Sequence, residues 1–104
     1  MLQAAKLVEN DCDAVDINLG CPQIIARRGH YGSYLLEEQD LVIEIVKTLH
    51  ENLSIPVTCK IRCLKSEEAT LKLAKRIEEA GCSLLTVHGR TKEQKKDSSG
   101  PCNW

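Results

Sequence analysis

A cysteine that follows a short apolar run is the side chain of this sequence best placed to do chemistry. The stretch Asp16-Ile17-Asn18-Leu19-Gly20-Cys21-Pro22 ends that run in an Asn, a Gly, a Cys and a Pro. The pattern predicts a strand that delivers Cys21 to a loop, and in a parallel α/β sheet the loops after the strands carry the chemistry. Cys21 is therefore a candidate catalytic group, although a loop thiol without a chemical role fits the same residues.

The thiol of Cys21 has two possible chemical uses, as a nucleophile or as a proton donor. An unperturbed cysteine has a pKa of about 8.5, so at neutral pH most of it is protonated and able to donate. Nucleophilic use requires a helix N-terminus or a nearby cation that lowers this pKa. His30 is a candidate activating base, but a lone histidine in a loop is also an ordinary surface residue.

The remaining cysteines predict packing rather than metal binding or disulfides. The six cysteines include no C-x-x-C pair, and the histidines show no paired spacing, so no metal site is expected. Nothing in the sequence indicates secretion or a membrane span, so we expect reduced thiols and a location in the cytoplasm, with the nucleus as the alternative. Cys59, Cys63 and Cys82 are predicted to pack in the core.

The charge balance predicts no general attraction to nucleic acid, because the formal net charge of the 104 residues is −1. Two local basic groups stand out against this average. One follows the Cys21 loop and the other follows the last predicted strand; their members are Arg27, Arg28, Lys92, Lys95 and Lys96. The two groups could flank one face, or each could be an ordinary solvated surface.

Hydrophobic periodicity predicts alternating helices and strands. Apolar side chains at spacings of three and four predict helices, and β-branched runs predict strands. The predicted elements are helix 2–11, strand 13–18, a long loop 19–34, helix 39–52, strand 57–62, a helix between a capping Ser66 and Gly81, and strand 83–88. A crossover helix between successive strands predicts right-handed connections and a parallel sheet.

The predicted fold class is α/β, as part of a TIM (β/α)8 barrel with about three parallel strands and crossover helices. Three strands cannot close a barrel, and both edges of such a sheet lack partners. We therefore expect residues 1–104 to be a fragment of a larger barrel domain.

Polar side chains gather at the same end of every predicted strand. They are Asp16 and Asn18 on the first strand, Lys60 and Arg62 on the second, and His88 and Arg90 on the third. In a (β/α)8 barrel this end is the active face, and a Lys, a His and an Arg together suit an anionic cofactor such as a flavin phosphate. Taken singly, a snorkelling lysine or a surface histidine would explain each residue.

Three motifs in register resemble the signatures of the tRNA-dihydrouridine synthase family. They are the Asp16–Pro22 stretch, Lys60-Ile61-Arg62 and Val87-His88-Gly89-Arg90-Thr91. Gly29-His30-Tyr31-Gly32 and Thr91-Lys92-Glu93-Gln94-Lys95 are most similar to the eukaryotic branch that acts on uridines 16 and 17 of the D-loop. The resemblance extends over nearly the whole chain.

The resemblance implies an FMN-dependent reduction of uridine to 5,6-dihydrouridine in tRNA, with NADPH as the reductant. The family's chemistry sends a hydride from the flavin to C6 of the uracil and a proton to C5. Cys21 would be the general acid that protonates C5, which agrees with a protonated thiol.

The resemblance also implies roles for the polar residues at the strand ends. Asn18 would hydrogen-bond the uracil, and Lys60 would contact the flavin ring. His88 and Arg90 would bind FMN nearer its phosphate, and Arg62 would contact either the flavin or the tRNA.

Reaching a uridine inside folded tRNA requires turning the base out of its stack. This costs a few kcal/mol, which basic contacts to the phosphates can offset. The candidate contacts are Arg27, Arg28, Lys92, Lys95 and Lys96.

The family's barrel has eight strands and a helical tRNA-binding domain follows it, so we expect residues 1–104 alone to bind FMN weakly and not to turn over. Two other interpretations stay open: an FMN-dependent barrel oxidoreductase of a small pyrimidine, or a non-catalytic fragment. Flavin content and uridine reduction would distinguish the three.

Overall fold

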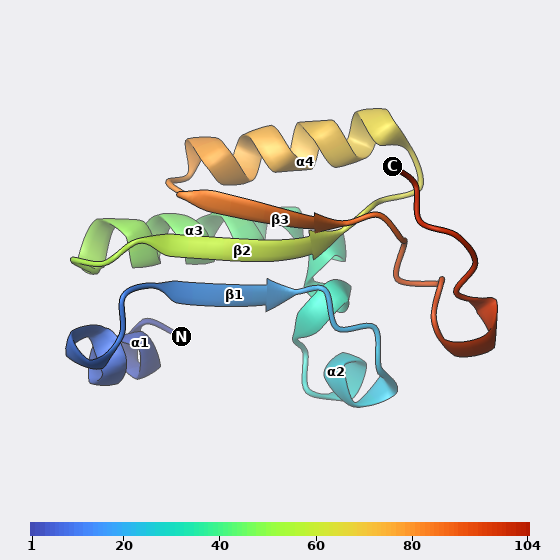
Figure 1. The fold of residues 1–104 in the computed structure, drawn as a ribbon. Helices are drawn as coiled ribbons and strands as arrows, with labels where there is room; N and C mark the ends of the chain where they lie inside the picture. The colour runs from blue at the N-terminus through green and yellow to red at the C-terminus, as the bar shows by residue number, and fades with distance from the viewer.

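Three parallel strands form one sheet in the computed structural model, which describes residues 1–104 apart from the side chain of Asp97. The strands β1 (Val15–Leu19), β2 (Val57–Arg62) and β3 (Leu84–His88) lie in that order, with β2 between the other two (Figure 1). Successive strands are joined by crossover helices. The predicted α/β class is confirmed, and the arrangement is that of part of a TIM (β/α)8 barrel.

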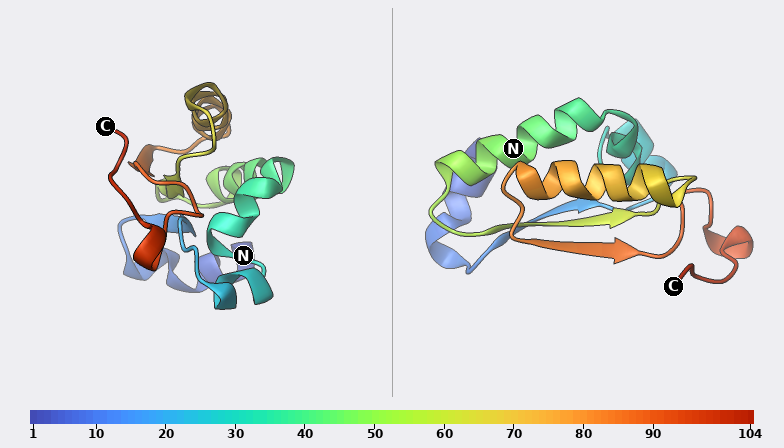
Figure 2. Two further views of the ribbon diagram at one scale, coloured as in Figure 1. Left: turned by 90° about the vertical axis from the view of Figure 1, so that its right-hand side faces the viewer. Right: turned by 90° about the horizontal axis from the view of Figure 1, so that it is seen from above.

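The longer helices cover one side of this sheet and leave the other side bare. Figure 2 shows α3 and α4 on the same side of the strands. The helical segments are α1 (Leu2–Val8), η1 (Glu9–Asp11), α2 (Ile24–Arg28), η2 (Gly32–Glu37), α3 (Gln39–Asn52), α4 (Glu67–Glu79) and η3 (Lys96–Ser98). None of the described helices is long and apolar enough to span a lipid bilayer.

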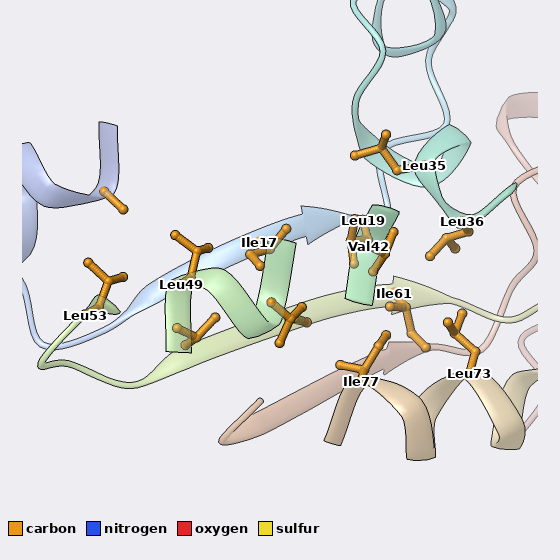
Figure 3. Close-up of a cluster of buried hydrophobic side chains, with 14 residues drawn as sticks. Ile17, Leu19, Leu35, Leu36, Val42, Leu49, Leu53, Ile61, Leu73 and Ile77 are labelled. Carbon is orange, nitrogen blue, oxygen red and sulfur yellow. The ribbon is translucent and has the colours of Figure 1, made fainter. Parts of the chain in front are cut away.

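The core lies between the sheet and the helices. Ile17, Leu19 and Ile61 point from the strands toward α3 and α4, where Leu49 and Ile77 meet them (Figure 3). These five side chains are buried. Since side chains alternate along a strand, the polar residues between these positions must point to the bare side.

The register brings those polar side chains side by side. Asn18 pairs with Lys60, and Lys60 pairs with Thr86. Arg62 pairs with His88 one step further along. The bare side of the sheet therefore carries Asn18, Lys60, Arg62 and His88 at neighbouring positions, whereas Cys21 and Arg90 lie in the loops beyond the strand ends.

The predicted helix 39–52 and strand 57–62 match α3 and β2, and Ser66 caps α4 by accepting a hydrogen bond from the Ala69 amide at 3.1 Å. The predicted loop 19–34 is wrong in part, because it contains α2 and the start of η2. The helix α2 has only five residues and its isoleucines are exposed, so the sequence there shows no amphipathic pattern.

Cys59 is buried as predicted, and Cys82 packs against the core. Cys63 is only half-buried, because β2 ends at the preceding residue.

Candidate active site at the carboxyl ends of the strands

The Cys21 loop begins with a turn that Asn18 shapes. The Asn18 Oδ1 atom accepts hydrogen bonds from the backbone amides of Gly20, at 3.0 Å, and Cys21, at 3.2 Å. This side chain closes an Asx-type turn at the end of β1, as Asn residues favour. Its Nδ2 group donates no hydrogen bond to the described residues, so it is available for another acceptor.

Three carbonyl groups of the same loop are held by other segments. The Gly20 carbonyl accepts from Arg62 Nε at 2.7 Å. The Cys21 carbonyl accepts from both the amide and the hydroxyl of Ser33, each at 2.9 Å. Residues from β2 and η2 thus fix the backbone on both sides of the thiol.

The next carbonyl, that of Pro22, has two donors. The hydroxyl of Tyr34 donates to it at 3.0 Å, and Lys95 Nζ donates to it at 2.8 Å. The Cys21 side chain itself is half-buried, and its thiol makes no hydrogen bond within the part of the chain that the structure describes. A rigid loop with an unengaged thiol is what a positioned proton donor requires.

Arg62 links the loops that follow two different strands. Besides its bond to Gly20, its Nη1 atom donates to the carbonyls of Thr91, at 3.1 Å, and Gln94, at 3.2 Å. The planar guanidinium suits this, because it presents several donors in fixed directions. In the structure Arg62 therefore positions the loops, while the contact to flavin or tRNA stays a prediction.

A positive charge cluster lies beside the Cys21 loop. Partial burial is the main cause that lowers the pKa of His88, and the charges of Arg62, Arg90 and Lys60 lower it further. Arg90 donates to the Gly100 carbonyl at 3.0 Å. Lys60 is exposed and has no ion pair or hydrogen bond among the described side chains.

This cluster fits an anionic cofactor. Lys60 has no ion pair among the described residues, and the charges of Arg62, Arg90 and Lys60 add to burial in lowering the pKa of His88. A phosphate or an electron-rich ring edge would find both a charge and donors there. The residues predicted to bind FMN, namely Lys60, His88 and Arg90, are therefore brought together and suit the group.

The basic residues predicted near tRNA divide into two sets. Arg27, Lys92 and Lys95 line one hollow of about 450 Å³ together with Tyr34. Arg28 and Lys96 are exposed and lie outside the lining of that hollow.

His30, the candidate activating base, pairs with Glu38 at the surface, so the structure gives it a partner other than Cys21.

Sequence reasoning missed three residues of η2 that contact the Cys21 loop. Ser33 is fully buried and Tyr34 half-buried, and both hydrogen-bond the loop. Gly32 has a φ of +67°, and a Cβ there would lie 2.6 Å from the Cys21 carbonyl oxygen. A glycine followed by a small hydroxyl residue within the long loop was the available signal for this close approach.

The family profile for dihydrouridine synthase (Dus) matches residues 1–104 of the chain. This chain belongs to the dihydrouridine synthase family. The resemblance seen in the three motifs is thereby confirmed.

Several relatives match nearly the whole chain. The tRNA-dihydrouridine(16/17) synthase of Saccharomyces cerevisiae, whose name includes NAD(P)(+), is 57% identical over all of this chain and 25% of its own length. A mouse protein named as similar to the 16/17 synthase is 55% identical over 99% of the chain and 22% of its own length. The 16/17 synthase of Schizosaccharomyces pombe is 53% identical over all of the chain. The chain spans about a quarter of the length of these relatives.

Proposed function

We propose that this chain carries the proton-donating part of an enzyme that reduces uridine to 5,6-dihydrouridine in the D-loop of tRNA. The observation that supports this best is the Cys21 loop, whose three carbonyls are all hydrogen-bonded while its thiol is left unengaged. Membership of the Dus family and the names of the relatives point to the same reaction. On this proposal residues 1–104 form part of the FMN-binding barrel domain.

The positive cluster on the bare side of the sheet supports FMN as the cofactor. FMN, when bound, supplies a hydride to C6 of the uracil, and NADPH is the proposed reductant that renews it. Lys60 would hold the ring by its free ammonium. His88 and Arg90 would bind nearer the phosphate, where the cations that add to burial in lowering the pKa of His88 favour an anion.

Cys21 would complete the reduction by donating a proton. The S–H bond breaks as the C5–H bond forms, and the remaining thiolate takes a proton from solvent. Asn18 would donate from Nδ2 to a uracil carbonyl, since its oxygen already holds the loop. A positioned general acid of this kind contributes about 10²–10⁴-fold to a rate.

The substrate, tRNA, would meet the protein through Arg27, Arg28, Lys92, Lys95 and Lys96. Phosphate contacts position a nucleic acid without reading its sequence. We expect residues 1–104 alone to bind FMN weakly and to be inactive, because both edges of the sheet lack a partner strand among the described residues. A cytoplasmic location, with the nucleus as the alternative, stays a prediction.

The test is to measure dihydrouridine in tRNA by mass spectrometry. Cells that lack the gene are rescued with the protein at its natural length, carrying either Cys21 or Cys21→Ala. We expect Cys21→Ala to lower dihydrouridine formation about 10²-fold or more, with bound flavin retained. Cys12→Ala is the matched control, because Cys12 is an exposed thiol that bonds only the Val8 carbonyl.

Two outcomes would contradict the proposal. Equal dihydrouridine in cells rescued with Cys21 and with Cys21→Ala would show that Cys21 is not the proton donor. Unchanged dihydrouridine at every tRNA position after deletion, in a strain without a second synthase for those sites, would favour an enzyme that reduces a small pyrimidine.

A further inference from the structure

A hollow beside the Cys21 loop is lined mainly by cations and one aromatic ring. Its volume is about 450 Å³, and its lining consists of Arg27, Tyr34, Glu37, Lys92, Glu93 and Lys95. Lys92 Nζ lies 5.3 Å from the centre of the Tyr34 ring, and Lys95 Nζ lies 6.0 Å from it. An aromatic ring between cations is a common surface for the phosphates and bases of single-stranded RNA.

One cation of this hollow is already paired with a carboxylate. Lys92 Nζ forms an ion pair with Glu37. The hydrogen bond and charge of Lys92, and also the charge of Arg27, hold the pKa of the Glu37 carboxyl below its ordinary value. The Glu37 carboxylate thus stands near two cations, where an incoming phosphate oxygen would stand.

In the ion pair between Lys92 and Glu37, the Glu37 side chain is the more exposed partner. The Glu37 side chain is 65% exposed, whereas that of Lys92 is 23% exposed. An ion pair with an exposed partner contributes little to stability, so an RNA phosphate can replace the carboxylate at little cost. Glu37 can then turn into solvent while Lys92 stays over the Tyr34 ring.

The position of the hollow connects it to the reacting base. Lys95 lines the hollow and donates to the Pro22 carbonyl at 2.8 Å. Tyr34 also lines the hollow, and its hydroxyl donates to the same carbonyl at 3.0 Å. A phosphate bound there lies one side chain away from the Cys21 loop. It would belong to a nucleotide close to the reacting uridine.

We propose that this hollow binds an RNA phosphate next to the reacting uridine. In the absence of RNA, Glu37 forms an ion pair with Lys92, and the phosphate displaces Glu37 when RNA binds. This inference rests on tRNA being the substrate. Glu37 therefore lowers the affinity for an RNA whose phosphate enters the hollow, because the carboxylate has to leave Lys92 first.

The test measures binding of an unmodified tRNA transcript to the protein at its natural length. All variants also carry Cys21→Ala, so binding is measured without turnover. We expect Glu37→Gln to tighten binding about 3- to 10-fold and Lys92→Met to weaken it about 10-fold, with the salt slope reduced by about 0.7–0.9. In a protein that already carries Lys92→Met, adding Glu37→Gln should not tighten RNA binding, because the effect of Glu37 acts through Lys92.

Glu93→Gln is the matched control. Glu93 lines the same hollow but forms no ion pair with Lys92 in the structure, so it reports the effect of net charge alone. Equal tightening by Glu93→Gln and Glu37→Gln, or a gain that persists without Lys92, would overturn the displacement. Weaker binding by Glu37→Gln would also overturn it, because the pair would then be structural. NADPH binding is titrated with the same variants. If Glu37→Gln and Lys92→Met change the affinity for NADPH but not for RNA, the assignment of the hollow to RNA is overturned.

Failure of this inference is distinguishable from failure of the proposed function. Binding that does not respond to Glu37→Gln, while cells with the Cys21 protein make dihydrouridine, would overturn the displacement and leave the proposed function standing. Tighter binding of the transcript by Glu37→Gln, together with unchanged dihydrouridine in cells that lack the gene, would overturn the proposed reaction and leave the displacement standing.

Discussion

Gly32 packs directly against Cys21. A Cβ atom at position 32 would lie 2.6 Å from the Cys21 carbonyl oxygen and 2.9 Å from the Cys21 Cβ, and the φ of Gly32 is +67°. The two residues are brought together by the bonds of the neighbouring Ser33 to the Cys21 carbonyl. The position of the thiol therefore depends on the absence of a side chain eleven residues later in the chain.

Replacing Gly32 by alanine should displace the Cys21 loop. The left-handed backbone alone costs about 1–2 kcal/mol with a side chain, and the contact with backbone atoms adds to this. A misplaced catalytic group can lose about 10² in rate, so we expect dihydrouridine formation to fall by that order. The measurements are the thermal unfolding midpoint and dihydrouridine content.

Gly20→Ala is the stability control for that experiment. A Cβ at Gly20 would have its nearest neighbours at 3.7 and 3.8 Å, which is ordinary contact. Its unfolding free energy should stay within about 0.5 kcal/mol of the parent. Equal destabilisation by the two substitutions would show that the close approach of Gly32 to Cys21 is unimportant.

Removing the Tyr34 hydroxyl should loosen the Cys21 loop. Tyr34→Phe keeps the ring but loses the 3.0 Å bond to the Pro22 carbonyl, which Lys95 still satisfies. We expect a loss of about 1 kcal/mol in unfolding free energy and faster alkylation of Cys21 by iodoacetamide. Tyr31→Phe is the matched control, because Tyr31 is exposed and its hydroxyl has no bond in the described structure. Identical alkylation rates would disprove the restraint.

Arg62 offers a way to separate positioning from substrate contact. Arg62→Lys cannot donate to the carbonyls of Gly20, Thr91 and Gln94 at once, so we expect a loss of about 2 kcal/mol in stability. If its role is positioning, the turnover rate falls while tRNA affinity stays the same. Arg76→Lys is the control, because among the described residues Arg76 bonds only the side chains of Gln39 and Asp40. Weaker tRNA binding with unchanged stability would instead support the predicted contact to substrate.

Protonation of His88 should oppose folding at low pH. Because burial and the nearby cations lower its pKa, the unfolded chain binds a proton more readily than the folded protein does. Stability should fall as the pH drops below about 6.5, the ordinary pKa of histidine, until the pH reaches the lower pKa of His88 in the folded state. His88→Gln should lose less stability over that range in urea unfolding.

An NMR titration checks the electrostatic cause. Lys60→Met removes one of the three cations that face His88, so it should raise the pKa of His88. A His88 pKa at or above the ordinary value in the parent protein would contradict both expectations.

The sequence by itself determined the elements that position the site. The periodicity of residues 39–52 and the β-branched run 57–62 predicted α3 and β2 with their observed ends. Their positions at the ends of three predicted strands indicated that Asn18, Lys60 and His88 gather at one end of the sheet. This succeeds because parallel strands direct their carboxyl ends to the same edge, whatever surrounds them.

Only the tertiary structure decided how the Cys21 loop is held. Arg62 bonds a carbonyl 42 residues earlier in the chain, and Lys95 bonds one 73 residues earlier. Lys92 reaches Glu37 across 55 residues. Periodicity reports which face of one element is apolar, but these contacts depend on side-chain reach between loops that only packing brings together.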